Sequence, residues 1–242
     1  RCLPPNIRTI PSRALAYSRS LNLHYLPKVL ESIGEYAFIE CKNLKLTEFP
    51  PSLCSVGKYA FKAASHLELS SLPSEMRTIP TGCFQDCEDM TLQKIPDSVT
   101  IIEDQAFNNC ISLNTVSLPN RMSKIGKAAF YGCGALQITS FPYGLTQVEY
   151  SAFEQCTSLK ELQLPDSLKE IGNSAFRWCS NLKIAELPGA VESVGPSAFE
   201  GCIALGSVKL SDSLTTIHDG AFRGCENLEI DALPSKVGYV AP

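Results

Sequence analysis

Residues 164–182 read Leu-Pro-Asp-Ser-Leu-Lys-Glu-Ile-Gly-Asn-Ser-Ala-Phe-Arg-Trp-Cys-Ser-Asn-Leu, and this stretch decides the fold of the 242-residue chain. Its phenylalanine belongs to a series that recurs every 23 residues without a slip: Phe38, Phe61, Phe84, Phe107, Phe130, Phe153, Phe176, Phe199 and Phe222, with Leu15 at the same phase. A fixed short period is typical of a stacked solenoid. The sequence therefore predicts one solenoid domain over residues 1–242, built from about ten 23-residue repeats.

The apolar positions around this repeat Phe are kept more strictly than the polar ones. Five residues before it the chain has only Ile or Val, from Ile10 to Ile217, and β-branched residues favour extended backbone. A small residue, almost always Ala, directly precedes the Phe, and Leu follows six residues after it, with Met90 as the one substitute. A unit this short cannot bury a core alone, so we expect each repeat to be stabilised by stacking on its neighbours.

Each repeat changes direction three times. The run from Leu159 to Pro165 predicts a short strand, which the proline ends because it has no N–H to extend a ladder. A second extended piece, residues 168–171, is followed by Gly172, which lets the backbone fold sharply. Residues 173–179 have apolar spacing of three, which predicts a helical turn. One coil of the solenoid is then strand, strand and helical turn.

The string Leu-Pro-x-x-Leu-x-x-Ile-Gly-x-x-Ala-Phe-x-x-Cys-x-x-Leu, intact from Leu164 to Leu182, resembles the BspA-type leucine-rich repeat. The similarity covers essentially the whole chain. It implies an α/β repeat solenoid: a curved leucine-rich-repeat array with a parallel β-sheet on one face and short helical turns and loops on the other. Members of this family resemble surface proteins and adhesins of bacteria and mucosal protists. The resemblance therefore also implies binding of partners through the array surface. Fold alone does not give function.

The spacing of the first predicted strand is not uniform. In most repeats the second apolar residue lies eight after the repeat Phe, as at Ile138 and Ile184, but at Val116, Leu162 and Val208 it lies nine after. From Leu113 onward the two forms alternate, which gives a superperiod of 46 residues. A one-residue shift would turn a strand inside out. We therefore expect either a bulge or a different strand start to restore the inward leucine before the proline.

Eleven cysteines raise the question of a disulfide scaffold or a metal site. Eight of them lie three residues after the repeat Phe, and Ser18 and Ala64 fill the two gaps in this ladder. Ser and Ala can replace a small packed side chain but not a bridge partner, which favours buried free thiols over occasional bridging or a reactive role. Cys2, Cys54 and Cys83 lie off the ladder, and we expect Cys2 and Cys54 to be exposed.

No motif in the chain predicts catalysis. There is no paired C-x-x-C, no H-E-x-x-H, no Gly-rich phosphate loop and no nucleophile elbow. The three histidines, His24, His66 and His218, occupy three different repeat phases, so stacking does not cluster them. We expect no catalytic, cofactor-binding or metal-binding residues and assign no cofactor.

Charge and hydropathy limit the classes of partner. The net charge of −4 and the interspersed Lys and Arg do not form the basic stripe that nucleic-acid binding needs. No apolar run approaches membrane-spanning length, so membrane insertion is not expected. The chain opens in mid-repeat and ends before another Ala-Phe arrives, which is typical of a segment of a longer array.

The most regular candidate binding surface is the outward position one residue before the last apolar residue of the first strand. Stacking lines up a polar row: Tyr25, Glu48, Ser71, Lys94, Ser117, Ser140, Gln163, Glu186, Lys209 and Ala232. With one aromatic, the row favours a protein partner over a sugar-stacking platform. The alternative is a row of merely solvated strand residues. Tyr131 and Trp178, on the helical-turn side, form a second candidate, since large rings near the surface anchor partners but also pack over neighbouring coils.

These patterns favour a noncatalytic protein-binding or adhesion module of a cell-surface or secreted leucine-rich-repeat protein. The partner would be a protein, for example a host surface or extracellular-matrix protein. The alternative is a cytoplasmic or structural scaffold that docks protein partners.

Overall fold

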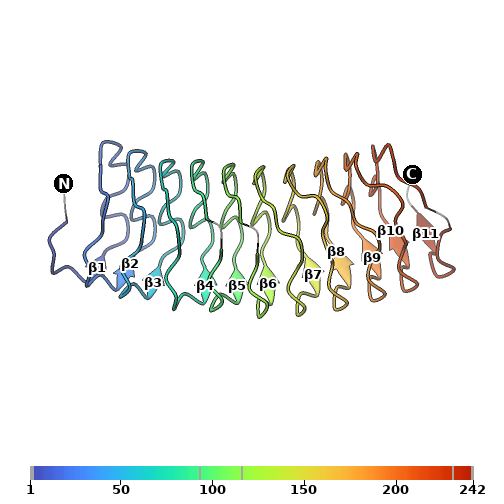
Figure 1. Ribbon diagram of the computed structural model, residues 1–242, viewed down its shortest axis with the longest axis horizontal. Helices are drawn as coiled ribbons and strands as arrows, with labels where there is room; N and C mark the ends of the chain where they lie inside the picture. Colours follow the sequence, from blue (N-terminus) through green and yellow to red (C-terminus); the bar gives the residue numbers. More distant parts are fainter. Residues whose placement is uncertain (1–2, 93, 116, 231, 241–242) are drawn as a thin grey trace.

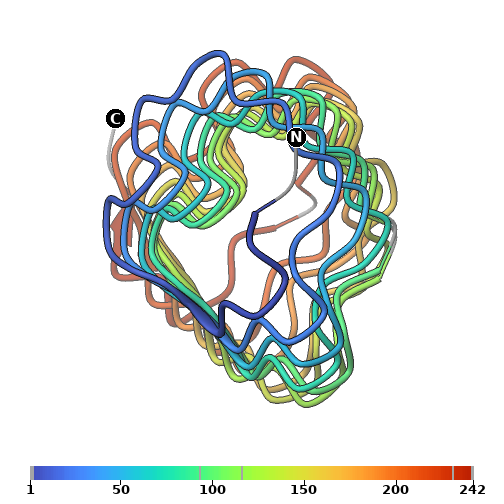
Figure 2. The same cartoon turned by 90° about the vertical axis from the view of Figure 1, so that its left-hand side faces the viewer.

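The computed structural model describes residues 3–92, 94–115, 117–230 and 232–240. The chain winds into a row of stacked coils, one per 23-residue repeat, and forms an elongated solenoid with its termini at opposite ends (Figure 1). Viewed along the axis, the coils follow similar paths that shift gradually from one end of the solenoid to the other (Figure 2). We number the coils by the repeat Phe, from coil 1 (Leu15) to coil 10 (Phe222). The expectations for Cys2 and Val116 fall outside the described residues.

Short parallel strands run along one side of the solenoid. The described residues contain eleven, each of two residues: β1 Thr9–Ile10, β2 Ser32–Ile33, β3 Ser55–Val56, β4 Thr78–Ile79, β5 Ile101–Ile102, β6 Lys124–Ile125, β7 Gln147–Val148, β8 Glu170–Ile171, β9 Ser193–Val194, β10 Thr216–Ile217 and β11 Tyr239–Val240. Paired strands are offset by one repeat, as at Ile10 and Ile33. In β1 to β10 the Ile or Val side chain is buried. The continuous strands are therefore the second extended piece of each repeat.

The strands form three sheets, β1–β3, β4–β6 and β7–β11. Proline explains the first interruption. In coils 2 and 3 the glycine after the strand donates its N–H to the preceding coil, as Gly57 does to Ile33 at 2.8 Å. Coil 4 has Pro80 at this position, and Pro80 has no N–H to donate to Val56. The ladder between β3 and β4 is broken there.

The glycines after the strands allow the backbones of neighbouring coils to approach closely. Gly57 has no positive φ. A Cβ atom on it would lie only 2.4 Å from the backbone nitrogen of Glu35 in the preceding coil. Glycine is used here because a second backbone occupies the space of a side chain.

The prediction of helical turns is wrong, because the described residues contain no helix. The residues two before and two after the repeat Phe both have a left-handed φ of 50° to 73° in all ten coils, as at Tyr36 and Glu40. Successive backbone N–H groups of this stretch donate in turn to their own coil and to the next one. The N–H of Ile39 donates to the carbonyl of Tyr36, three residues back, whereas the N–H of Phe38 donates to the carbonyl of Ala60 in the next coil. Helical residues would have negative φ, and their amides would donate within their own turn. We call the stretch around each repeat Phe the turn segment.

The core is a stack of phenylalanine rings. From Phe38 to Phe222 successive repeat Phe centroids lie 5.3 to 5.7 Å apart, with ring planes within 6° to 13° of parallel. Such offset stacking adds about 0.5–1.5 kcal/mol per pair beyond area burial. The preceding Ala is also buried wherever it occurs from Ala37 to Ala221. The small residue before the repeat Phe and the Phe itself therefore share one buried core.

The segment before the proline forms isolated bridges, and they explain the alternating spacing. In coil 7 only Leu162 lies between the bridged residues Glu161 and Gln163, whereas coil 8 has Ile184 and Ala185 between Lys183 and Glu186. The coils in which the second apolar residue lies eight after the repeat Phe therefore carry one extra residue between the bridges, which is a bulge. Ala185 and Glu186 are consecutively exposed, and Leu187 returns to the core. The bulge is one of the two solutions expected from the sequence.

Candidate binding surface

All ten residues of the polar row are exposed, as the repeat phase predicts. Backbone bridges make neighbours of Lys94 and Ser117, Ser140 and Gln163, and Glu186 and Lys209. The row thus crosses the coils side by side on a regular backbone. At one end, Tyr25 leaves 66% of its surface exposed.

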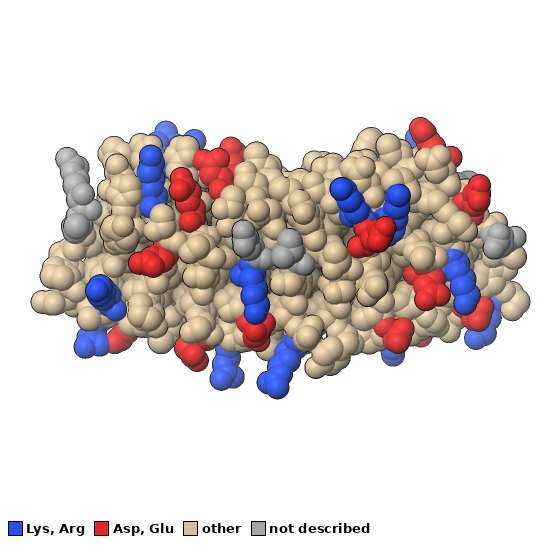
Figure 3. Space-filling model, in the orientation of Figure 1, with Lys and Arg blue, Asp and Glu red and all other residues tan. Residues whose placement is uncertain are grey.

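The charges of this row are sparse. Lys94 pairs with Asp97 at 2.9 Å, and both side chains are well exposed, so the pair adds little stability. No ion pair within the described residues involves Glu48, Glu186 or Lys209. Figure 3 shows a surface on which charged side chains are scattered among larger uncharged areas. Glu48, Glu186 and Lys209 can therefore offer their charges to a partner without first breaking an internal pair, and the exposed Lys94–Asp97 pair costs little to break.

Trp178 and Tyr131 lie on the turn segments, but in different settings. Trp178 is 49% exposed, and its ring lies against the next coil, 3.3 Å from where a Cβ atom on Gly201 would be. The hydroxyl of the partly buried Tyr131 accepts a hydrogen bond from Gln155 at 3.0 Å. Trp178 therefore packs over its neighbour and also presents an exposed face.

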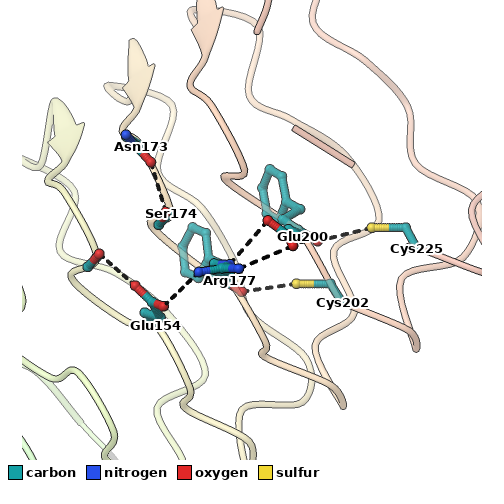
Figure 4. A network of polar contacts seen from close by, with 10 residues as sticks. Glu154, Asn173, Ser174, Arg177, Glu200, Cys202 and Cys225 are labelled. Atoms are coloured by element: carbon teal, nitrogen blue, oxygen red, sulfur yellow. Dashed lines mark hydrogen bonds and ion pairs between the residues drawn. The ribbon is translucent and has the colours of Figure 1, made fainter. Parts of the chain in front are cut away.

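Arg177, beside Trp178, forms a network with two carboxylates that the sequence reading missed (Figure 4). It lies 3.1 Å from Glu200 and 3.7 Å from Glu154, which belong to the following and preceding coils. Ser151 donates to the buried carboxylate of Glu154 at 2.6 Å. All three charged residues directly follow a repeat Phe, so their common phase was the available signal.

The network also affects titration. A hydrogen bond from Ser197, followed by the Arg177 and Arg223 guanidiniums, holds the pKa of Glu200 below its ordinary value against the opposing effect of burial. Glu200 is therefore charged at neutral pH and complements Arg177. The Arg177 guanidinium also lies over the Trp178 ring, 5.6 Å from its centroid, within the range of a cation–π interaction.

The cysteine ladder is a structural device. Each ladder thiol donates to a backbone carbonyl of the preceding coil, as Cys202 does to Phe176 and Cys225 to Phe199, both at 3.1 Å (Figure 4). All ten described cysteines are free, and Cys54 is the exposed one among them. Burial raises the pKa of Cys179 to about 12, and of Cys41 and Cys225 to about 11. These thiols are poor nucleophiles at neutral pH.

The residues that the structure describes hold no group of three or more His, Cys, Asp and Glu side chains that could bind a metal ion. They also form no helix with the length and apolar character needed to cross a membrane.

The sequence matches the family model of the BspA type leucine rich repeat region, with six copies, over residues 8–137 and 100–229. Similar solved structures include a leucine rich cell surface protein of Faecalibacterium prausnitzii, 28% identical with a TM-score of 0.61, which covers 96% of this chain and 72% of that one. A leucine-rich repeat protein of Bacteroides ovatus is 28% identical with a TM-score of 0.56, over 95% and 71% of the two chains. A leucine rich repeat protein of T. pallidum is 26% identical with a TM-score of 0.57, over 84% and 86%. No curated protein matches the chain.

Proposed function

Since this chain belongs to the family of BspA-type leucine-rich repeat proteins, we propose that it is a noncatalytic protein-binding or adhesion module of a cell-surface or secreted protein. A similar chain is a cell surface protein, which supports the location. The partner would be a protein, and a host surface or extracellular-matrix protein fits the adhesion role.

One observation carries this proposal: ten exposed side chains that differ from coil to coil stand at one repeat position, while the buried positions around them stay nearly constant. A regular, rigid support loses little conformational freedom when a partner binds. The variable side chains then provide specificity, as is usual for surfaces carried by a rigid scaffold.

The exposed face of Trp178 supports a second candidate on the turn segments, together with Tyr131. Tryptophan and arginine are enriched among residues that dominate binding energies, and Arg177 accompanies Trp178 here. Trp178→Ala that weakens partner binding without lowering the melting temperature would identify Trp178 as a partner anchor. A lowered melting temperature with unchanged binding would identify it as packing.

The polar row is tested with a variant that reverses four of its charges, Glu48→Lys, Lys94→Glu, Glu186→Lys and Lys209→Glu. Its net charge is unchanged. Purified protein is titrated against immobilised extracellular-matrix proteins by biolayer interferometry. We expect saturable binding that the variant loses, because like charges now meet where the partner placed opposite ones.

A matched control reverses four exposed charges away from the row, Lys124→Glu, Lys169→Glu, Glu170→Lys and Glu192→Lys. It should bind as the unmodified protein does, and both variants should keep the melting temperature. Equal loss in both variants would indicate non-specific charge attraction. Absence of binding by a well-folded chain would favour the alternative, an intracellular or structural scaffold.

A further inference from the structure

Two cavities lie along the segments that carry the polar row, and they occupy equivalent positions 46 residues apart. The first has a volume of about 370 Å³ and is lined by Gln137, Ile138, Thr139, Ser158, Lys160 and Glu161. The second, of about 580 Å³, is lined by the residues 46 positions later, Lys183, Ile184, Ala185, Ala204, Gly206 and Ser207, and also by Glu161, Leu162 and Gln163. Both volumes fall within the roughly 300–1,000 Å³ typical of ligand sites.

The alternating bridges place these cavities. Coils 7 and 8 are joined at Glu161 and Lys183, early in the segment. Coils 6 and 7 are joined late, at Ser140 and Gln163, and coils 8 and 9 likewise at Glu186 and Lys209. Each cavity opens at a junction where the early bridge is missing. The two cavities therefore arise from the fold itself and lie two coils apart, about 9.6 Å at 4.8 Å per coil.

The lining of the first cavity is rich in unused hydrogen-bonding groups. Within the described residues, no side-chain hydrogen bond or ion pair involves Gln137, Thr139, Ser158, Lys160 or Glu161. These groups include both donors and acceptors. The floor is apolar, because Ile138 in the first cavity and Leu162 and Ile184 in the second are buried. A polar rim over an apolar floor matches a sugar ring, which has hydroxyl groups at its edge and C–H bonds on its faces.

The charges favour an uncharged ligand. Glu161 lines both cavities, so an anionic chain would meet its carboxylate at each step. Lys160 and Lys183 stand beside Glu161 and disfavour a cationic chain. A peptide fits less well, because the lining has no aromatic or arginine anchor and the strands here are not free edges.

We propose that these two cavities bind alternate residues of a neutral β-linked oligosaccharide that runs along the solenoid axis. Such a chain presents the same face after every two rings, as the cavities recur after every two coils. Recognition is by hydrogen bonding in a pocket and not by stacking on aromatics. The second cavity shares Gln163 with the polar row. The variants that test the two proposals have no residue in common, so the two proposals fail separately.

The test is calorimetric titration of the whole chain with the neutral cellohexaose and chitohexaose. The disaccharide cellobiose, an anionic hyaluronan hexasaccharide and a Pro-Pro-Gly repeat peptide are compared. We expect a neutral hexasaccharide to bind more tightly than cellobiose, because it reaches both cavities. Glu161→Ala should weaken that binding at least about tenfold, since it removes hydrogen bonds to a charged group in both cavities.

Gln137→Ala should reduce the advantage of the hexasaccharide over cellobiose, because it impairs one cavity. Lys45→Ala changes the same repeat position as Lys160 in a coil away from the cavities and should leave binding unchanged. All three variants should keep the melting temperature. No binding of either neutral hexasaccharide at millimolar concentration, or equal binding by Glu161→Ala, would overturn the proposal. Binding of hyaluronan or the peptide alone, lost in Glu161→Ala, would overturn it in favour of that ligand.

Discussion

At the scale of single residues, the left-handed positions of the turn segments carry a conformational cost wherever the residue is not glycine. Gly224 has φ +71°, and a Cβ atom there would find its nearest neighbour at 3.7 Å. Space is thus available, and only the backbone conformation opposes a larger residue. Gly224→Ala should lower the free energy of unfolding by about 1 kcal/mol, the cost of a left-handed conformation for an L-residue. Urea unfolding followed by circular dichroism measures this change.

Gly189 is the matched control. It has no positive φ, and nothing lies within 4 Å of the position of its Cβ. Gly189→Ala should leave stability unchanged or raise it by about 0.4–1 kcal/mol, because alanine restricts the unfolded chain. Equal effects at both positions would contradict the conformational explanation.

Cysteine reactivity is a second property of single residues. In the native protein, Cys54 should react with a thiol reagent such as DTNB at neutral pH, whereas the buried ladder cysteines should react only on unfolding. Burial raises their pKa, which leaves almost no thiolate at neutral pH, and it also blocks access. The measurement is made in a Cys2→Ser background, with Cys54→Ser as control. Cys225 is only partly buried, so one slow label there is compatible with a closed ladder. Rapid labelling of further ladder thiols in the native double variant would show that the ladder opens.

At the scale of elements, the phenylalanine stack is the feature that joins coil to coil. Phe130 and Phe38 are both fully buried. Phe130 stacks on Phe107 and Phe153, whereas Phe38 stacks on Phe61 alone within the described residues, because coil 1 carries Leu15 at this position. Leu15 also shows that leucine is compatible with the site. Phe130→Leu should therefore cost about 1–3 kcal/mol, the value of two ring pairs, and Phe38→Leu about half as much.

Chemical denaturation of the two variants gives the comparison. A cost at Phe38 equal to that at Phe130 would show that volume, and not ring stacking, determines the contribution of these side chains.

The elements also show how far sequence patterns could be taken. The period of Phe176 was sufficient to predict the solenoid, the buried Ile and Val and the exposed row, because each depends on one repeated position. The helical turn was wrong because an apolar spacing of three fits both a helix and a chain of turns. Left-handed backbone at Glu40 and Trp178 distinguishes the turns from a helix. Glutamate and tryptophan do not predict a left-handed conformation as glycine would.

The candidate sites were less predictable for a related physical reason. Repeat phase places a residue within its own coil but does not show which contacts form between coils. Arg177 joins Glu154 and Glu200 across three coils, and the cavities arise from bridges that alternate between junctions. The superperiod of 46 residues was visible in the sequence, yet its consequence depended on which strand carried the bulge.

At the scale of the whole molecule, the second half of the solenoid has a unit of two coils. The bridges repeat with this period, and so does the charge after the repeat Phe, which runs Glu154, Arg177, Glu200 and Arg223. Deletion of residues 160–205 removes 46 residues and joins Leu159 to Gly206, which keeps bulged and regular coils alternating and places Glu154 beside Arg223. Deletion of residues 160–182 removes 23 residues, places two bulged coils side by side and brings Glu154 next to Glu200.

The number of coils alone predicts that the 23-residue deletion is the more stable protein, because a solenoid gains stability with each added repeat. We expect the reverse: the 46-residue deletion should have the higher melting temperature although it is one coil shorter. In the 23-residue deletion, the new junction joins two bulged coils, so the bridge that forms between a bulged and a regular coil has no counterpart there. The same junction sets the carboxylates of Glu154 and Glu200 together without the arginine that separates them in the intact chain. Thermal unfolding at pH 7, followed by circular dichroism, compares the two proteins. A higher melting temperature for the 23-residue deletion would show that the single coil, and not the pair, is the unit of stability.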